Sequence, residues 1–285
     1  MTKALAVIVV CVASAAGVSW AGAQGSASVG GIPVIAICCG LAFAVQWIAF
    51  VPSCLLRTEQ YYDLTGSITY LSTTWLAVLL SGSIHPRALI LGGAISVWAV
   101  RLGTFLFRRV RRDGKDGRFD EIKTSPSKFL IAWTLQGLWV FLTLCAALAA
   151  ITTEDPAALG WRDAVGGGIW LVGFAIEVVA DRQKTVFKER RDGDFIDVGL
   201  WSWSRHPNYF GEIVLWIGVA VVASSTLTGW GWVTMISPVF VAVLLLKISG
   251  IPMLEERADE RWGDREDYEA YKARTSVLVP WPPGD

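Results

Sequence analysis

The chain has 285 residues, 53% of them hydrophobic, which is too apolar for a soluble protein of this size. Its 25 basic and 25 acidic residues give a net charge of zero, so no overall positive field would attract nucleic acid. The 5 cysteines and 2 histidines show no spacing typical of a metal site. We therefore expect no metal and no nucleic-acid partner, and we expect the cysteines to be small buried hydrophobic residues.

Long apolar runs recur along the chain. A bilayer-spanning helix needs about 20 mostly apolar residues. Such runs lie near residues 4–22, 32–52, 67–84, 88–107, 129–151, 165–181, 210–227 and 231–249. They predict an all-α polytopic membrane bundle of about seven to eight transmembrane helices, forming a single membrane-embedded domain over 1–285. The first run also resembles a cleavable secretory signal, and we favour an uncleaved helix.

The basic residues predict the orientation of the bundle. If the amino terminus is cytoplasmic, the cluster at 108–128, the segment 182–205 and the tail after Lys247 all lie on the cytoplasmic side. Arg87 and Arg162 then lie outside. This asymmetry satisfies the positive-inside rule and supports an even number of spans in an integral membrane protein.

The second span carries Gln46, and the loop after it contains Tyr61, Tyr62 and Asp63. Tyrosines there are typical of an interfacial aromatic belt, which needs no further function. The alternative is a set of hydrogen-bond donors at the mouth of a pocket, and Asp63 is the residue that a belt explains least.

Charged side chains also occur inside the fourth and sixth spans. Arg101 either reaches the headgroups or faces the bundle, where it would meet a carboxylate or a phosphate. Glu177 and Asp181 are four residues apart and share one helical face. We expect both acids to face the bundle interior, as cofactor ligands or as salt-bridge partners of Arg101 or Arg205.

The stretch 199–218 holds the densest group of polar residues at a membrane border. Pro207 can begin a helix, since its missing amide hydrogen would be unpaired there anyway. Positive charge and free amides at a helix start attract a phosphate or a carboxylate. The candidate ligands in this stretch are Arg205, His206, Asn208, Tyr209 and Glu212.

The tail at 250–285 differs in composition from the spans. Gly250-Ile251-Pro252 should break the last span. The pattern of residues 254–262 is typical of an amphipathic helix, which should lie on the cytoplasmic face. Tyr271 and its basic neighbours could cover an adenine or a phosphate, or could simply anchor the surface.

These residues resemble the steroid 5-alpha-reductase family of membrane reductases, particularly its bacterial branch. The similarity covers roughly 60–280 and is strongest at 173–188, 204–218 and 249–280. The resemblance implies a helical bundle with a cytoplasmic NADPH pocket, in which Asn208 to Glu212 and Asp181 contact the cofactor. It also implies a lipid-accessible pocket for an apolar enone, whose activated C=C bond would be reduced.

The sequence departs from the family where animal enzymes hold the substrate carbonyl with a glutamate and a tyrosine. Gln46 lies near the position of that glutamate, and Trp98 lies at that of the tyrosine. Tyr61, Tyr62 or Asp63 would then have to donate to the carbonyl oxygen, and a steroid is a less obvious substrate than another apolar lipid.

A second family is similar over the same motif. Arg205-His206-Pro207-Asn208-Tyr209-Phe210-Gly211, with Glu255-Glu256 and 263–271 behind it, resembles isoprenylcysteine and phospholipid methyltransferases. Those enzymes bind S-adenosylmethionine at the corresponding place, so the motif alone does not name the cofactor. A third hypothesis, a non-enzymatic lipid-binding membrane protein, leaves the acids at 177, 181 and 212 without a role.

Overall fold

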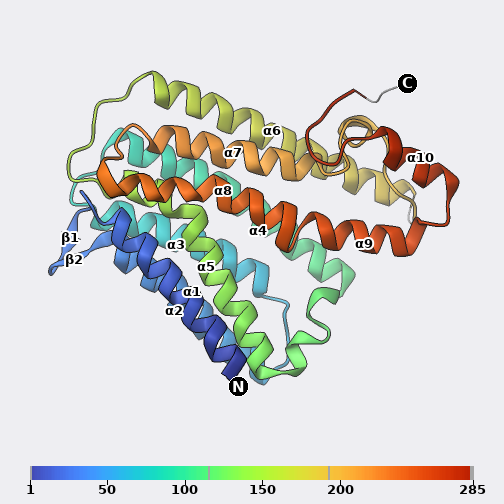
Figure 1. Cartoon of the computed structure of the whole chain (residues 1–285), viewed down its shortest axis with the longest axis horizontal. Helices are drawn as coiled ribbons and strands as arrows, with labels where there is room; N and C mark the ends of the chain where they lie inside the picture. Colours follow the sequence, from blue (N-terminus) through green and yellow to red (C-terminus); the bar gives the residue numbers. More distant parts are fainter. Residues whose placement is uncertain (1, 115, 192, 283–285) are drawn as a thin grey trace. The chain divides into compact units, whose positions relative to one another are not determined.

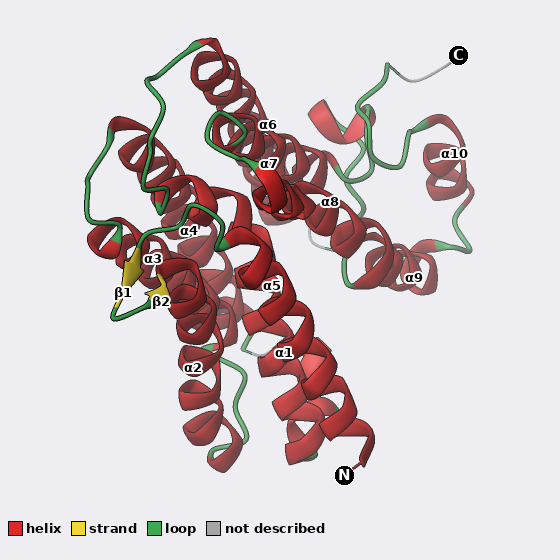
Figure 2. Cartoon of the chain, turned by 60° about the vertical axis from the view of Figure 1, so that its left-hand side comes forward, coloured by secondary structure: helices red, strands yellow, loops and turns green. Residues whose placement is uncertain are grey.

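The computed structural model describes residues 2–114, 116–191 and 193–282, most of which are helical (Figure 1). Lys115 of the predicted basic cluster and residues 283–285 of the predicted tail lie outside this range. Two short strands, β1 (Ser28–Val29) and β2 (Ile32–Pro33), pair in an antiparallel ribbon, which is yellow in Figure 2.

The chain separates into two compact units, each made of two stretches. Unit 1 comprises Met1–Asp163 and Val222–Ser237, and unit 2 comprises Ala164–Val221 and Pro238–Asp285. Each unit is described here by itself. That the whole chain acts as one membrane-embedded domain stays a prediction.

Unit 1 is built around α5 (Pro126–Ile151), against which α1 (Thr2–Gly22) and α2 (Val34–Leu55) pack. The second half of α5 is buried almost without interruption, and four of the five cysteines are buried as expected. The other helices are α3 (Tyr62–Leu80), α4 (Pro86–Asp113) and the short η1 (Gly117–Phe119), η2 (Ile122–Thr124) and η4 (Gly229–Met235).

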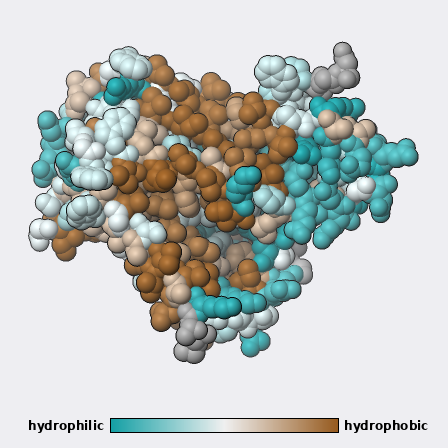
Figure 3. Space-filling model, viewed as in Figure 1, coloured by the Kyte–Doolittle hydropathy of each residue, from teal (hydrophilic) through white to brown (hydrophobic). Residues whose placement is uncertain are grey.

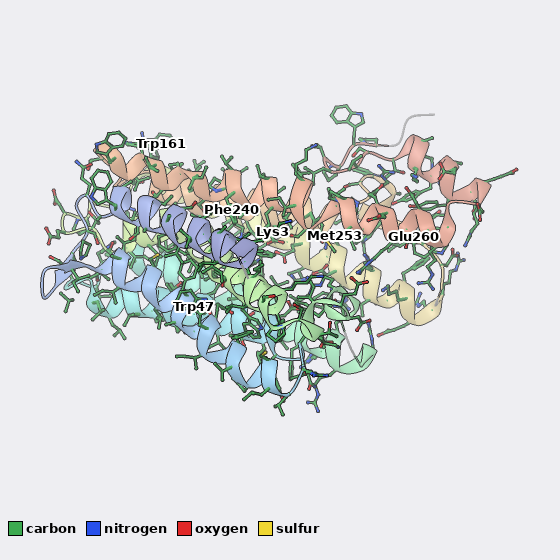
Figure 4. The ribbon with its side chains drawn as sticks, turned by 60° about the horizontal axis from the view of Figure 1, so that its bottom comes forward. Lys3, Trp47, Trp161, Phe240, Met253 and Glu260 are labelled. Carbon is green, nitrogen blue, oxygen red and sulfur yellow. The ribbon has the colours of Figure 1, made fainter. Side chains whose placement is uncertain are left out.

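Unit 2 contains the long α6 (Trp161–Arg190) and α7 (Pro207–Ala223), with the short η3 (Gly199–Ser202) between them. A later run passes through α8 (Ile236–Val243), a π-helical turn (Leu244–Ile248) and α9 (Ile251–Trp262), and α10 (Glu266–Arg274) follows. Phe240, Met253 and Glu260 mark successive parts of this run in Figure 4. The predicted amphipathic helix is confirmed as α9, with Pro252 in its first turn.

Six helical segments of the described chain are long and apolar enough to cross a membrane. They are Lys3–Gly22, Val34–Leu55, Pro86–Arg112, Pro126–Ile151, Trp161–Arg190 and Gly229–Trp262, and Pro207–Ala223 is a shorter apolar helix. The expected span at 67–84 overlaps α3, which ends at Leu80 and is not among these six segments. Asp63 and several threonines make this helix less apolar than the others. In Figure 3, hydrophobic side chains cover α6, α7 and α8, whereas hydrophilic ones cover α9 and α10. The protein is an all-α polytopic membrane bundle.

Glycines allow α6 and α7 to pack with their backbones in contact. A Cβ atom added to Gly173 would lie 2.4 Å from the amide nitrogen of Leu215, and one added to Gly211 would lie 2.6 Å from that of Glu177. A Cβ on Gly218 would lie 2.5 Å from the amide nitrogen of Trp170. Small residues permit such close approach between membrane helices. The packing places Glu177 beside the start of α7, where the predicted ligands lie.

Candidate functional site

The segment 199–206 of unit 2 is held first by the C-terminal part of α6. Leu200 donates its backbone N–H to Oε1 of Gln183 at 2.9 Å. Gly199 adopts a positive φ of 65°, and a Cβ on it would lie 2.6 Å from Nε2 of Gln183. Only glycine fits both the backbone conformation and the space.

Trp201 and Tyr271 lock the next part of this segment. The indole Nε1 of Trp201 donates to the carbonyl of Ala180 at 3.0 Å, and the hydroxyl of Tyr271 donates to the carbonyl of Trp201 at 2.8 Å. Burial raises the pKa of Tyr271, so its hydroxyl remains protonated as this bond requires. The hydroxyl of this predicted ligand is therefore engaged within the protein, and its ring remains to line a site.

The C-terminal tail completes the frame. The backbone N–H of Arg205 donates to the carbonyl of Ser276 at 2.9 Å, in a parallel bridge between Ser204 and Ser276. The hydroxyl of Ser204 donates to the carbonyl of Leu278 at 2.7 Å and accepts from the N–H of His206 at 3.1 Å. These bonds fix the backbone from which Arg205 and His206 project.

Glu255 of α9 binds both of those side chains. Its Oε1 lies 2.7 Å from Nε2 of His206, and its Oε2 lies 3.1 Å from Nη1 of Arg205. Burial lowers the pKa of His206, and the carboxylate of Glu255 acts against that shift. The sequence placed Glu255 in the methyltransferase-like pattern. That pattern does not reveal that Glu255 lies beside Arg205 and His206 in the folded protein.

Next to these residues lies a cavity of about 250 Å³, formed entirely by unit 2. Among the predicted ligands, Arg205, His206 and Tyr271 line it. The Nε of Arg205 is buried and has no hydrogen-bond partner in the described part of the chain. A buried donor without a partner is costly, so the side chain of Arg205 is held at some expense in stability.

The cavity combines basic and aromatic side chains. Its basic residues are Lys184, Lys188, Arg205, Arg257 and Arg261, and its rings are Phe187, Phe195, Trp201, Trp262, Tyr268 and Tyr271. Arginine and lysine suit phosphate groups, and ring faces suit a planar base. Sequence reasoning missed Arg257 and Arg261, although their spacing of four residues on an amphipathic helix was a signal that they share one face.

The remaining predicted ligands of unit 2 lie on α6 and α7. Pro207 begins α7 as predicted, so Asn208, Tyr209 and Glu212 occupy its first two turns, each half-buried. The ring of Tyr209 stacks on that of His206, with centroids 5.7 Å apart and planes 13° apart. This stacking joins the start of α7 to the residues that line the cavity.

Glu177 and Asp181 are 2% and 5% exposed, which agrees with the expectation that they face the protein interior. Arg101 belongs to unit 1, where its guanidinium lies 5.5 Å from the ring centroid of Phe105. Whether these three residues bind a cofactor stays a prediction.

Among the predicted catalytic residues of unit 1, Gln46 is fully buried. Its Nε2 donates to the hydroxyl of Thr69 at 2.8 Å, while its Oε1 has no hydrogen-bond partner in the described residues. Tyr61 is 49% exposed, and its ring stacks on Phe107 with centroids 6.4 Å apart. Of the two residues, Tyr61 is the more accessible.

Tyr62 is buried among aromatic rings rather than at a pocket mouth. Its ring centroid lies 4.7 Å from that of Phe119 and 5.0 Å from that of Trp133. Its hydroxyl donates to the carbonyl of Ala132 at 2.9 Å. Tyr62 therefore ties α3 to α5, and this bond would have to break before the hydroxyl could serve a substrate.

Asp63 is part of an ion-pair network that holds the basic loop. Its carboxylate lies 3.4 Å from Arg118 and 3.8 Å from Arg109, and both arginines also bind Asp116. Nearby, Lys123 binds Glu59 at 2.8 Å. The network accounts for an aspartate that an aromatic belt left unexplained.

We expect Asp116→Asn to lower the free energy of unfolding by about 1.5–3 kcal/mol at neutral pH, because Asp116 accepts charge-assisted bonds from Arg118. Burial alone would raise the pKa of Asp116, but the bonds from Arg118 outweigh it and lower that pKa. This stabilisation is complete above the unfolded pKa of about 4 and is lost as pH falls through the lower folded pKa. The difference in Tm from the wild type should shrink on acidification.

Asp155→Asn is the control. Asp155 is exposed, so this substitution should change Tm little at neutral or acidic pH. A pH-independent difference between wild type and Asp116→Asn would contradict the role given to the ionised carboxylate.

Comparison with known proteins agrees with the resemblance found in the sequence. Residues 49–275 match the family model described as a protein of unknown function (DUF1295). Steroid 5-alpha-reductase DET2 of Arabidopsis thaliana is 26% identical over 220 residues, which cover 73% of this chain and 77% of that protein. DET2 of Gossypium hirsutum is 35% identical over 82 residues, or 28% and 30% of the two chains.

An uncharacterised protein of Schizosaccharomyces pombe is 22% identical over 176 residues, so the match spans about half of each protein, 50% of this chain and 51% of that one. No solved structure matches the chain. The family match covers most of the sequence and includes the stretch 199–218, α9 and α10. The chain therefore belongs to the DUF1295 family, which is the steroid 5-alpha-reductase-like family.

Proposed function

We propose that the protein is a membrane-bound, NADPH-dependent reductase of an activated C=C bond in an apolar, lipid-like substrate. The observation that carries the proposal is the cavity of unit 2, which is lined by both basic side chains and aromatic rings. The similarity of this chain to plant proteins named steroid 5-alpha-reductase supports the same reaction class.

The residues present fit a phosphorylated dinucleotide. Arg205 and Lys184 would hold phosphate groups, while His206 and Glu255 orient Arg205 through the bonds described above. Asn208, Tyr209 and Glu212, with Glu177, Asp181 and Arg101 as further candidates, would bind the amide and ribose groups. NADPH itself supplies the hydride, which would go to the carbon β to a carbonyl.

Negative charge would then develop on the substrate carbonyl oxygen, and a donor in a dry site would stabilise it. The candidates are Tyr61, which is half-exposed, and Gln46, through its amide, with Tyr62 as the engaged alternative described above. The carboxylate of Asp63 accepts from Arg118 and, as a carboxylate, has no proton to donate to that oxygen. We further propose that the protein resides in a bacterial inner membrane with the cofactor site facing the cytoplasm, since the basic segments 108–128 and 182–205 favour that orientation.

One observation favours S-adenosylmethionine as a second candidate cofactor. Glu255 contacts both Arg205 and His206, so two separate parts of the methyltransferase-like pattern meet in space. S-adenosylmethionine carries no phosphate, so a methyltransferase would not need a 2′-phosphate site. The cavity observed here is lined by five basic residues.

The test is thermal unfolding of the detergent-purified protein with NADPH, NADH and S-adenosylmethionine in parallel. A ligand at about 100 times its Kd stabilises the folded state by about 2.7 kcal/mol, which gives a measurable rise in Tm. Stabilisation by NADPH, followed by NADPH oxidation with enone lipids, is the expected result. Stabilisation by S-adenosylmethionine alone would overturn the reductase assignment.

Glu255→Gln should weaken NADPH binding by about 10- to 100-fold, because Arg205 and His206 lose the carboxylate that positions them. Glu256→Gln is the matched control, since Glu256 is the exposed neighbour on the same helix and does not line the cavity. Both affinities can be measured by isothermal titration calorimetry, with the ligand-free Tm as a check on folding. Equal weakening in the two variants would contradict this role for Glu255.

A further inference from the structure

Four large apolar side chains are exposed where segment 199–206 of unit 2 meets the C-terminal tail. Trp203, Val277, Val279 and Trp281 have exposed fractions of 45%, 42%, 55% and 72%. Residues 275–282 contain no charged side chain. An exposed apolar patch of this kind marks a surface that contacts a protein or a membrane.

Hydrogen bonds hold these side chains in fixed positions. The backbone N–H of Trp281 donates to the carbonyl of Trp203 at 3.1 Å. The hydroxyl of Ser204 donates to the carbonyl of Leu278, and the N–H of Arg205 donates to the carbonyl of Ser276. The tail is thus bonded along its length to residues 203–205, and its apolar side chains are presented by an ordered surface.

Helix α6 indicates where the hydrocarbon core ends on unit 2. Its 30 residues make it about 45 Å long, whereas the core is about 30 Å thick, so part of the helix lies outside the core. Val172 and Val179 are exposed apolar residues of α6, and Arg182 is the first exposed charged residue that follows them. The border of the core should therefore lie between Val179 and Arg182.

Segment 199–206 is bonded to α6 at this border. Trp201 donates to the carbonyl of Ala180, and Leu200 donates to Gln183. The next apolar helix, α7, begins at Pro207. Trp203 and the tail bonded to it therefore lie close to the level at which the lipid headgroups begin.

The composition of the patch suits this level. An indole ring combines a large apolar surface with one N–H group, and tryptophan is enriched where hydrocarbon meets water. Insertion of residues 275–282 would desolvate no charged side chain. The apolar patch is also continuous in level with the exposed apolar face of α6, which lipid already covers in a membrane protein.

We propose that Trp203 and residues 277–281 insert into the headgroup layer of the bilayer and form an interfacial anchor beside the cavity of unit 2. The anchor holds the segment that carries Arg205 at the membrane surface. Neither the cofactor nor the substrate of the proposed reaction enters this assignment, which needs only that α6 and α7 lie in the membrane.

The experiment measures the depth of nitroxide spin labels in the full-length protein, reconstituted into vesicles of phosphatidylethanolamine and phosphatidylglycerol. Labels are attached at Val279→Cys and, separately, at Trp281→Cys, in a Cys54→Ser background, because the other four cysteines are buried. Oxygen concentrates in the bilayer and a nickel chelate stays in water, so the ratio of their relaxation effects reports the depth. Both labels should lie about 5–10 Å into the boundary between headgroups and acyl chains.

Two positions of unit 2 serve as references. Leu171→Cys lies on the exposed apolar face of α6 and should be relaxed mainly by oxygen, whereas Glu260→Cys is exposed on α9 and should be relaxed mainly by the nickel chelate. The Val279→Cys variant retains both tryptophans. Replacing Trp203 and Trp281 with serine in that variant should shift the label toward the value at Glu260→Cys, and the Tm of each variant checks its folding.

Two results would overturn the anchor. Relaxation by the nickel chelate at 279 and 281 equal to that at Glu260→Cys would place the tail in water. Labels that neither reagent reaches would show that protein, such as a second copy of the chain, covers the patch. Either result would leave the proposed reductase function standing, because ligand binding by the cavity tests that function separately.

Discussion

Replacing Arg87 with alanine is expected to lower the free energy of unfolding by about 3–5 kcal/mol, the largest single effect that we anticipate. The Arg87 side chain is 1% exposed and binds both carboxylate oxygens of Asp163, at 2.7 and 3.0 Å. It also donates to the carbonyls of Ala157 and Ala158. Alanine would leave the buried carboxylate of Asp163 without its cation and would remove the donor to the carbonyls of two exposed residues.

The measurement is the Tm of the purified variant in detergent, compared with Arg162→Ala. Arg162 is exposed, is adjacent to Asp163, and donates to the carbonyl of Ser224 at 3.2 Å, so its loss should change stability by about 0.5 kcal/mol or less. The double variant Arg87→Met with Asp163→Leu should recover most of the loss, since it removes both charges. If the Arg87→Ala variant kept the Tm of the wild type, the ion pair between Arg87 and Asp163 would not stabilise the folded protein.

The second large effect is expected at the contact between α6 and α7. Gly211→Ala should destabilise the protein by about 1–3 kcal/mol, because the new methyl group would need space now occupied by the backbones of Glu177 and Gly173. Alanine favours a helix by about 1 kcal/mol over glycine, so a net loss would have to come from the clash. Glu177 would move with the backbone, and ligand binding by unit 2 should weaken as well.

Gly168→Ala provides the control for this prediction. It lies on α6, and a Cβ there would have no neighbour within 4 Å, so helix propensity alone should act and Tm should stay the same or rise. If Gly211→Ala were as stable as Gly168→Ala, the two helices would not pack as closely as described.

Much of the fold could be predicted because membrane helices carry strong local signals. The apolar runs identified the helices of unit 1, Pro207 identified the start of α7, and the period of residues 254–262 identified α9. The set of spans was harder to define at α3, because buried threonines reduce hydropathy without disrupting a helix inside a bundle. Hydropathy reports the average environment of a segment and not the side to which each residue turns.

The candidate site was less predictable because its contacts join residues far apart in sequence. Tyr62 and Asp63 looked like free donors, yet Ala132 and Arg118, 70 and 55 residues away, engage them. Arg205, His206 and Tyr271 were identified from their residue types, but the link through Glu255 depends on how α9 folds back. Similarly, Gly173 and Gly211 are ordinary helix residues until both helices are placed together.

The frame around segment 199–206 has a consequence for biosynthesis. His206 precedes Glu255 by 49 residues, and Ser204 precedes Leu278 by 74, so the segment leaves the ribosome long before its partners do. Helices α6 and α7 can enter the membrane in the meantime, while Arg205 and His206 remain solvated by water. A chain interrupted before Ser276 would consequently lack the bonds that hold Ser204 and Arg205, so that residues translated well after α7 determine whether the frame around the cavity forms.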